Sequence, residues 1–250
     1  LQNGLNQHQH HQNNMGAFGG PDIVEDGLMF ALDAGSTRSY PNPGTGTVVN
    51  SLVSSITGSL TNGVGFNTNN GGTWDFDGVD DILFAGVGTD YAYPYHSWEM
   101  WFKTSQVDFN GVGGLVGLDY GRNMYLTGSN SGTIIYTLYS NMSQPNVLVK
   151  SISGGTNLLD NEWHQVICSR GTSTCEIWID GALVTTASNG GQATWNGINQ
   201  WSAMAARFGD NPNNSGSNFE GGIPIIRIYN KQLSATEVLQ NYNAQKNRFI

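Results

Sequence analysis

Four carboxylates lie close together in the segment TWDFDGVDDILF, residues 73–84. Over seven positions, in a chain of which only 12% of residues are charged, the segment carries Asp75, Asp77, Asp80 and Asp81. Grouped carboxylates hold hard cations such as calcium, act as general acid and base, or accept hydrogen bonds from backbone amides in turns. The segment is therefore a candidate calcium site, catalytic pair or structural turn.

Catalysis finds little support elsewhere in the chain. Glycoside hydrolysis requires two carboxylates about 5–9.5 Å apart, and no two of the six glutamates lie close together with an aspartate between them. Glu99 and Trp101 share one strand face, which suits a sugar-binding pair, but an exposed polar residue is the simpler interpretation. Neither His96 nor His164 is directly flanked by an acidic residue or a cysteine, and we expect His164 to be packed. We therefore predict no enzymatic activity, with a glycoside hydrolase as the weakest alternative.

Two segments rich in aromatic residues, YAYPYH and TWNGINQW, are candidate glycan-binding loops. Aromatic rings offer broad apolar faces with polar edges, which suit the C–H faces of sugar rings. The alternative is that these rings pack over the end of the fold. The candidate glycan-binding residues are Tyr91, Tyr93, Tyr95, Trp195 and Trp201.

The charge balance limits the classes of partner. The net charge is −9 and the isoelectric point about 4.7, with ten lysines and arginines scattered along the chain. Binding to nucleic acids or anionic membranes needs a basic face, and no apolar run approaches the roughly 20 residues of a membrane span. We expect neither a nucleic-acid partner nor membrane insertion. The opening residues lack the apolar core of a signal peptide.

The first 26 residues differ in composition from the rest. They are rich in glutamine, asparagine and histidine, then in glycine, with almost nothing apolar to bury. We interpret residues 1–26 as an extended polar arm, ordered only against a partner, and residues 27–250 as one domain. His8, His10 and His11 could chelate a metal, although a polar tail is the simpler interpretation.

From residue 27 onward, short apolar runs alternate with glycine and asparagine turns, a pattern typical of an all-β sandwich. Asp180-Gly181 is the dipeptide preferred in tight type I′ turns. Pro224 lies within the apolar run GGIPIIRIYN and requires a bulge or an edge strand, because proline cannot donate to a ladder.

A helix is predicted over QLSATEVLQNYNAQKN, residues 232–247. Ser234 and Glu237 have the spacing of a capping box, in which side chains satisfy the free backbone N–H groups at a helix start. The predicted apolar stripe consists of Val238, Leu239 and Tyr242.

The two cysteines lie seven residues apart in a predicted hairpin. If Gly171-Thr172 forms a two-residue loop, Cys168 lies directly opposite Cys175. The pair then forms a cross-strand disulfide or two buried thiols, and we favour the thiols because a core of this size needs no covalent staple.

Six segments, in this order, resemble the laminin-G-like branch of the concanavalin A-like jelly-roll superfamily: GLMFALDAGSTRSYPNPGTGT, WDFDGVDDILF, SWEMWFK, LLDNEWHQVICSR, CEIWIDGALV and FEGGIPIIRIYNKQLSATEVLQNYNAQKNRF. The resemblance covers Gly27 to Phe249. It implies an all-β fold, a two-sheet antiparallel jelly-roll sandwich with a short C-terminal helix.

The resemblance also implies a role for the clustered aspartates. In the family, Phe76 points into the core and Asp77-Gly78 form a turn. We favour a purely structural role for the aspartates in this turn. Members often bind calcium at the rim of the sandwich, which makes calcium the alternative and the candidate cofactor. Its candidate ligands are Asp77, Asp80 and Asp81, with Asp33, Asp210 and Asn211 as further donors.

The two ends of the domain look most like domains of tailed-phage structural proteins. The resemblance implies a non-catalytic component of the virion surface, such as a decoration, fibre or appendage protein, that also binds host glycans weakly. The implied partners are other virion proteins, contacted through the arm, cell-surface glycans, and further copies of the chain. The alternative is a secreted, extracellular bacterial carbohydrate-binding or adhesion module.

Overall fold

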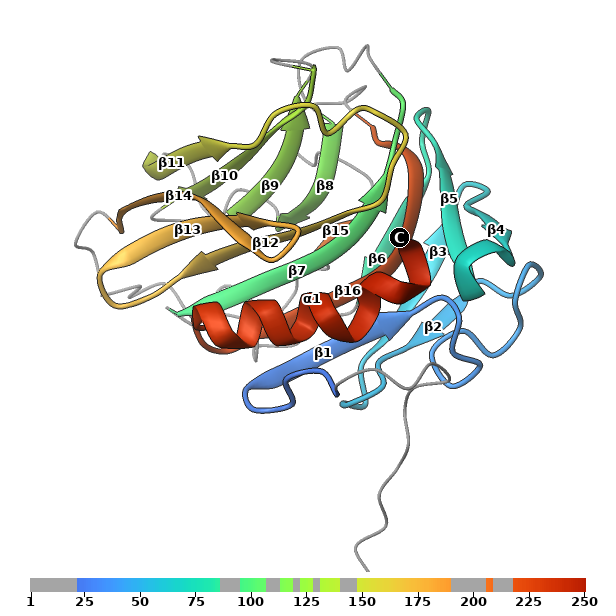
Figure 1. Cartoon of the computed structure of the whole chain (residues 1–250). Helices are drawn as coiled ribbons and strands as arrows, with labels where there is room; N and C mark the ends of the chain where they lie inside the picture. Colours follow the sequence, from blue (N-terminus) through green and yellow to red (C-terminus); the bar gives the residue numbers. More distant parts are fainter. Residues whose placement is uncertain are drawn as a thin grey trace, which may run out of the picture.

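A computed structural model describes residues 22–85, 95–106, 113–118, 122–127, 131–139, 148–189, 206–208 and 218–250. These residues form two antiparallel β-sheets packed face to face, with a helix across the outer side of one sheet (Figure 1). The predicted two-sheet sandwich with a C-terminal helix is confirmed.

The sheet that carries the helix, here called the front sheet, has the order β14-β13-β12-β7-β16-β5-β4, and β1 also pairs with β16. Because β5 pairs with the first half of β16 and β1 with the second half, these two strands share one edge of β16. The strands of the front sheet are β1 (Leu28–Asp33), β4 (Gly65–Asn67), β5 (Thr73–Asp77), β7 (His96–Lys103), β12 (His164–Arg170), β13 (Thr174–Ile179), β14 (Ala182–Ser188) and β16 (Glu220–Tyr229).

The opposite sheet, here called the back sheet, has the order β11-β10-β9-β8-β15-β6-β3-β2. Its strands are β2 (Val48–Asn50), β3 (Thr57–Thr61), β6 (Ile82–Ala85), β8 (Gly113–Leu118), β9 (Arg122–Thr127), β10 (Thr133–Tyr139), β11 (Leu148–Gly154) and β15 (Ala206–Phe208).

The main hydrophobic core lies between the two sheets. Strand β7 shows how the sequence pattern creates it: Trp98, Met100 and Phe102 alternate along the strand and are all buried in this core. Trp98 meets Tyr136 of the back sheet edge-to-face, with ring centroids 6.5 Å apart. Burial of each such side chain contributes about 1.5–3 kcal/mol, so these residues hold the sheets together.

Pro224 lies in β16, a central strand of the front sheet. Because proline has no backbone N–H, it interrupts the hydrogen-bond ladder with a neighbouring strand. The pairing of β16 with β7 shifts register between Gly222 and Ile225, so the proline occupies a bulge. Its carbonyl oxygen still accepts a hydrogen bond from the Ala34 N–H at 2.9 Å. The predicted bulge is confirmed.

The two predicted hairpins differ in outcome. Asp180 and Gly181 both have positive φ, 52° and 79°, as the predicted type I′ turn requires. The predicted loop at Gly171-Thr172 is wrong, because the Gly171 N–H donates to the Thr174 carbonyl at 2.8 Å and the loop moves one residue along.

The moved loop places Cys168 opposite Ile177 and Cys175 opposite Arg170. A register shift of two residues keeps every side chain on its face of the sheet. Both cysteines are therefore buried, as predicted, and they are free thiols rather than a disulfide. Burial raises the pKa of the Cys175 thiol to about 11.

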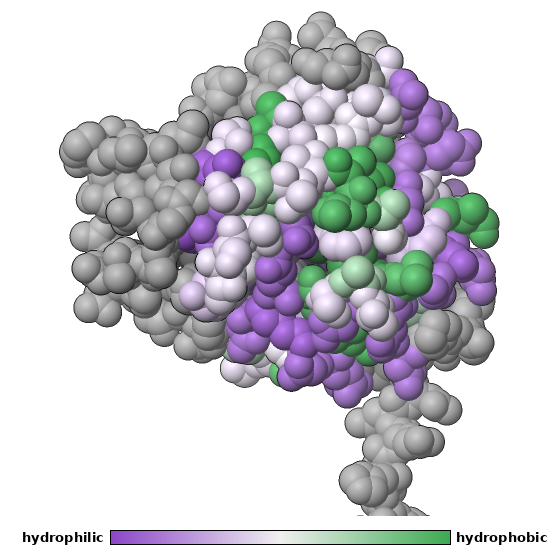
Figure 2. Space-filling view, turned by 60° about the vertical axis from the view of Figure 1, so that its left-hand side comes forward, coloured by the Kyte–Doolittle hydropathy of each residue, from purple (hydrophilic) through white to green (hydrophobic). Residues whose placement is uncertain are grey.

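Strand β14 forms an edge of the front sheet, and its Leu183 and Val184 are 47% and 45% exposed. The Thr185 hydroxyl donates to the carbonyl of Ser153 in β11 at 2.8 Å, so the two sheets meet at this edge. Figure 2 brings this side forward and shows a limited hydrophobic patch among residues of intermediate hydropathy, with hydrophilic residues beyond them.

Helix α1 (Ala235–Phe249) begins with the predicted capping box. The Ser234 N–H donates to the Glu237 carboxylate at 2.9 Å, and the Glu237 N–H donates to the Ser234 hydroxyl at 3.4 Å. The predicted apolar stripe is wrong in one position: Leu239 is 49% exposed, whereas Asn241 is fully buried.

Residues 22–26, at the end of the segment interpreted as an arm, pack on α1. Val24 is 5% exposed, and its N–H donates to Asn241 Oδ1 at 2.8 Å. The Asp22 carbonyl accepts from Gln240 Nε2 at 2.8 Å, and Asp26 forms an ion pair with Lys231. Residues 1–21 lie outside the described ranges. Within those ranges, no helix has the length and apolar character needed to cross a lipid bilayer.

Candidate functional site

At the rim of the sandwich, Asp77 ends β5 of the front sheet, and Asp80 and Asp81 lie in the connection from β5 to β6 of the back sheet. Carboxylate oxygens of Asp77, Asp80 and Asp81 all lie within 4.8 Å of one another. Phe76, immediately before the connection, is buried in the core as expected. The fold therefore brings together the three aspartates that the sequence grouped.

Hydrogen bonds show the structural part of their role. Asp77 Oδ1 accepts from the Val79 N–H at 2.8 Å, and Asp81 Oδ2 accepts from the Asp77 N–H at 3.0 Å. The carbonyl of Asp80 accepts from Asn62 Nδ2 at 2.6 Å. These bonds satisfy the backbone of the turn, as aspartates in turns commonly do.

The same cluster contains a carboxylate oxygen suited to a cation. Asp81 is only 2% exposed, and its Oδ1 has no hydrogen-bond partner among the described residues. Burial raises the pKa of the Asp81 carboxyl; the Asp77 amide opposes this rise, and the charges of Asp77 and Asp80 add to it. A bound cation would relieve both the burial cost and the repulsion, and three carboxylates match the hard oxygen donors that calcium prefers.

Of the further donors suggested for calcium, Asp33 does not join this cluster. Asp33 Oδ1 instead accepts from Arg248 Nη1 at 2.8 Å and from the Gly35 N–H at 2.8 Å. Asp210 and Asn211 lie outside the described residues.

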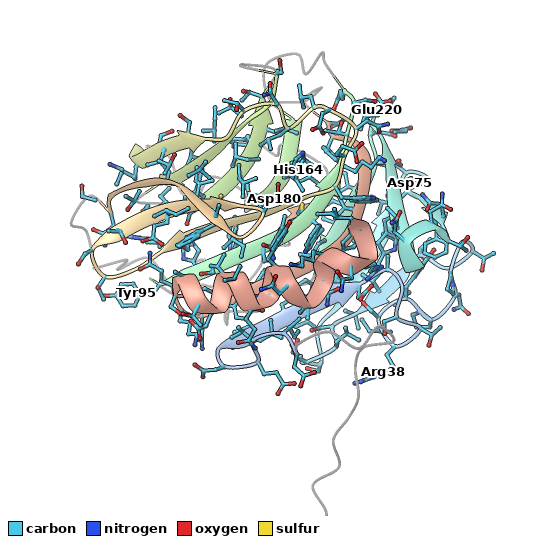
Figure 3. All side chains as sticks on the ribbon, viewed as in Figure 1. Arg38, Asp75, Tyr95, His164, Asp180 and Glu220 are labelled. Carbon is cyan, nitrogen blue, oxygen red and sulfur yellow. The ribbon has the colours of Figure 1, made fainter. Side chains whose placement is uncertain are left out.

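Of the five aromatic candidates, Tyr95 alone lies within the described ranges. It immediately precedes β7 and is partly exposed. Figure 3 shows it beside the N-terminal end of α1, far from Asp75 and Glu220 at the other end of the helix. The remaining candidates, all outside the described residues, are Tyr91, Tyr93, Trp195 and Trp201.

A polar pocket of about 320 Å³, which the sequence did not reveal, opens on the outer face of the front sheet past the C-terminal end of α1. Strands β4, β5, β7 and β16 supply its floor, and the turn η1 (Asn69–Gly71) and the residues before β12 supply its walls. The lining side chains with most bearing on recognition are Asn67, Thr73, Asp75, Lys103, Trp163 and Glu220.

Trp163 is the aromatic wall of this pocket. A Cβ atom at Gly222 would lie 3.0 Å from its ring carbon Cη2, so the absence of a side chain at Gly222 lets the indole lie on the sheet. The ring also contacts Phe249 of α1, with centroids 5.0 Å apart, and Lys103 Nζ lies 5.9 Å from its centroid. The indole is thus fixed between the helix end and the sheet.

Asp75 is the central acceptor of the pocket floor. It projects outward from β5 because its neighbours Trp74 and Phe76 face the core. Asn67 of β4 donates from Nδ2 to Asp75 Oδ2 at 2.6 Å. Strand alternation predicts that Asp75 faces outward, but only the pairing of β4 with β5 brings Asn67 to it.

Glu99 contradicts the sequence-based interpretation. It is 1% exposed and lies under α1 rather than in solvent. Its carboxylate accepts hydrogen bonds from Arg227 Nη1 at 2.7 Å, Gln165 Nε2 at 2.9 Å and Asn241 Nδ2 at 2.7 Å. This network of hydrogen bonds attaches α1 to the front sheet. Because Glu99 is used in it, Glu99 forms no sugar-binding pair with Trp101.

His164 lies between two carboxylates that are distant in sequence from each other. Its Nδ1 is 2.8 Å from Asp180 Oδ2 and its Nε2 is 3.2 Å from Asp160 Oδ1 (Figure 3 labels His164 and Asp180). Burial alone would lower the pKa of the imidazole, but the hydrogen bonds and charges of Asp180 and Asp160 outweigh it and raise the pKa. Because both ring nitrogens bind carboxylates, neither is left to activate a nucleophile.

Comparison with solved structures identifies the same fold in several binding domains. The receptor binding domain of botulinum neurotoxin mosaic serotype C/D is 16% identical, with a TM-score of 0.64 over 88% of this chain and 51% of that chain. Domain 4 of an extracellular arabinanase from Geobacillus stearothermophilus, in complex with arabinotriose, is 14% identical, with a TM-score of 0.61 over 88% of this chain and 100% of that domain. This chain spans about half the length of the neurotoxin domains it matches. At these identities the likeness shows the fold alone.

At the level of sequence, no curated protein matches the chain. Residues 89–239 match the family described as the concanavalin A-like lectin/glucanases superfamily. This match covers more than half of the chain, and the two-sheet sandwich is the architecture that the resemblance implied. The chain is a member of the concanavalin A-like lectin/glucanase superfamily.

Proposed function

We propose that this chain is a non-catalytic glycan-binding domain displayed on the surface of a tailed-phage particle, as a decoration, fibre or appendage protein. The observation that carries the glycan-binding part is the polar pocket, in which one aromatic wall stands beside amide, hydroxyl and carboxylate groups. Sugar sites combine these features, because a sugar ring presents C–H groups on its face and hydroxyls at its edge.

The structural neighbours support this proposal. One of them, the ligand binding domain of botulinum neurotoxin serotype D, is in complex with N-acetylneuraminic acid, and the arabinanase domain holds arabinotriose. Another neurotoxin binding domain is in complex with rat synaptotagmin II. Recognition of external ligands is thus compatible with this fold, although a shared fold does not by itself carry a function.

The particle-surface role rests on the resemblance of both ends of the domain to phage structural proteins. Residues 22–26, at the end of the segment interpreted as an arm, pack on α1, and this attachment suits a tether to other virion proteins. Mass spectrometry of purified particles tests this role. Recovery of the chain in the particle fraction is expected, and its confinement to the culture supernatant would contradict it.

The alternative function is a secreted bacterial carbohydrate-binding or adhesion module. The observation in its favour is the match to the arabinanase domain over 100% of that domain, since that domain belongs to an extracellular enzyme. Recovery of the chain from the supernatant alone would favour this alternative.

We include calcium in the proposal, held at the rim by Asp77, Asp80 and Asp81. A bound ion would neutralise the repulsion among the three carboxylates and stiffen the connection between the sheets. Ligands that bind only the folded state raise its stability by mass action. Calcium is therefore expected to raise the Tm of the wild-type chain and not that of Asp81→Asn, whereas Glu25→Gln, at an exposed position outside the cluster, keeps the response.

A glycan array probed with the full chain, in calcium and again in EDTA, tests the proposed binding. Binding to at least one class of glycan is expected. Binding that EDTA abolishes would tie recognition to the aspartates, and binding that survives EDTA would tie it to the pocket or the aromatic loops. The absence of binding in both conditions would contradict the glycan-binding function.

A further inference from the structure

The pocket past the end of α1 has a composition that discriminates among saccharides. We infer that it is the saccharide subsite of this chain and that it takes an uncharged sugar ring, packed against the exposed part of Trp163 and hydrogen-bonded to Asp75 and Asn67. The inference rests on the proposed glycan-binding function and adds to it a location and a ligand class.

The central group of the pocket floor, the Asp75 carboxylate, accepts hydrogen bonds. The Asp75 carboxylate acts only as an acceptor, with about four lone-pair positions on its two oxygens. Asn67 uses one of these positions, at 2.6 Å, and its own Oδ1 accepts from the Asn69 N–H at 3.0 Å. Asp75 is thus oriented by its neighbour and keeps acceptor positions for sugar hydroxyls, which donate readily.

The charges around the pocket disfavour acidic sugars. Among the described residues that line it, two carboxylates, Asp75 and Glu220, stand against one cation, Lys103. Glu220 pairs directly across the ladder with Asp77, so the acidic rim cluster continues the negative charge beyond the pocket edge. The whole chain carries a net charge of −9. A sugar carboxylate would therefore meet repulsion that a neutral sugar avoids.

Arg248 is a positioning residue for the pocket wall. Its Nη2 donates to the Gly72 carbonyl at 2.8 Å and its Nε to the Asn70 carbonyl, while Asn70 Nδ2 donates back to the Arg248 carbonyl at 2.8 Å. These bonds attach turn η1, which carries Asn69 and Asn70, to the end of α1. A wall ordered in advance spares the ligand the entropic cost of ordering it.

Isothermal titration of the full chain tests the inference. The neutral probes are arabinotriose, maltotriose and N-acetylchitotriose, and the anionic probes are N-acetylneuraminic acid and digalacturonic acid. The wild-type chain is expected to bind a neutral probe more tightly than either anionic probe, in calcium and in EDTA. Tighter binding of an anionic probe would overturn the assigned ligand class.

Variants locate the site. Asp75→Ala is expected to weaken binding of the neutral probe about tenfold or more, since it removes charge-assisted hydrogen bonds, and Trp163→Ala to weaken it by a similar factor. Arg248→Ala is expected to weaken it by a smaller factor, with partial rescue in Arg248→Lys. The matched control Glu25→Gln changes an exposed carboxylate outside the pocket and leaves binding unchanged.

The outcomes separate the inference from the function on which it rests. If the wild-type chain binds a neutral probe and Asp75→Ala binds it equally well, the pocket is not the subsite. Loss of binding in Tyr95→Ala or Trp195→Ala would then locate glycan binding in the aromatic loops and leave the proposed function standing. Failure of the wild-type chain to bind any glycan would overturn both.

Because Trp163 packs on Phe249, the folding of Trp163→Ala is checked by circular dichroism, and Asp75→Ala keeps the test valid if Trp163→Ala unfolds.

Discussion

The outer face of the front sheet consists of two regions built from the same strands, β7 and β16, yet with opposite character. Under α1, Glu99 of β7 and Arg227 of β16 form a buried ion pair at 2.7 Å, with side chains 0% and 5% exposed. Beyond the end of the helix, Lys103 of β7 and Glu220 of β16 line an open pocket. The difference between the two regions is the helix that covers one of them.

A charged residue on the outer face of a strand therefore has a different role depending on whether another element covers it. A buried carboxylate requires hydrogen-bond donors or a cation to offset its high desolvation cost. Glu99 meets that requirement with three donors, so it has little capacity left for a ligand. Asp75, half-buried beyond the helix, is supported by Asn67 and remains accessible from the pocket.

The largest expected effect on stability comes from removing the charge of Glu99, in the region that α1 covers. Glu99→Gln leaves Arg227 buried without its counter-charge and is expected to lower the free energy of unfolding by about 3–5 kcal/mol. Glu220→Gln, the matched change at an exposed position, is expected to change it by less than about 0.5 kcal/mol. Chemical denaturation of both variants measures the difference, and equal effects would contradict the distinction between the two regions.

Asn241 links the covered region to the segment before β1. Its Nδ2 donates to Glu99 and to the Tyr229 hydroxyl, and its Oδ1 accepts from the Val24 N–H. Asn241→Leu keeps a similar volume but leaves these groups unsatisfied, which is expected to cost about 1–3 kcal/mol. Hydrogen exchange should then accelerate at the amide of Val24. Unchanged exchange there would show that Asn241 does not hold this segment.

A substitution at the start of α1 perturbs the same helix more weakly. Ser234→Ala removes the hydroxyl that accepts from the Glu237 N–H and is expected to lower stability by about 1 kcal/mol. The loss should appear in thermal unfolding, while the affinity of the pocket for a neutral saccharide stays unchanged because the pocket lies at the other end of the helix. A large change in affinity would mean that the two regions are coupled through α1.

His164 gives the smallest expected effect and has a defined pH dependence. Asp180 and Asp160 raise the pKa of its imidazole in the folded state. The charged histidine therefore stabilises the fold below the unfolded-state pKa of about 6.5, and this contribution is lost as pH rises through the folded-state pKa. Since the pair with Asp160 is solvent-screened, the contribution is expected to be below about 1 kcal/mol.

The measurement is the stability difference between the wild-type chain and His164→Gln at several values of pH. The difference should be larger near pH 5.5 than near pH 8. A difference that grows with pH would contradict the raised pKa.

Several features of this protein follow from local sequence because their physical causes are local. The alternation of Trp98, Met100 and Phe102 predicts which side of β7 faces the core. Asp180-Gly181 predicts its turn through positive φ, and Pro224 predicts its bulge through a missing N–H. The rim cluster also follows from sequence, because its aspartates are near neighbours along the chain.

Other features depend on elements that meet only after folding. Glu99 is buried because α1, more than 130 residues away in sequence, lies over it. The predicted loop between β12 and β13 is wrong by one residue, because two registers bury the same side chains. Only the observed pairing of the two strands distinguishes these registers. The hydrophobic character of Leu239 similarly gave no indication that the buried position, two residues later, is Asn241, which Glu99 and Val24 bind.

Sequence by itself determined the strand faces, the Asp180-Gly181 turn and the helix cap, since each depends on residues a few positions apart. It also indicated the superfamily, through six short segments in the right order. Tertiary structure alone decided which charged side chains are buried and which remain accessible to a ligand. Trp163, Asp75, Asn67 and Lys103 come from four different segments, and nothing in their local patterns marks them as neighbours. They form a pocket because α1 ends short of them, and the coverage of one element by another is a property of the folded chain.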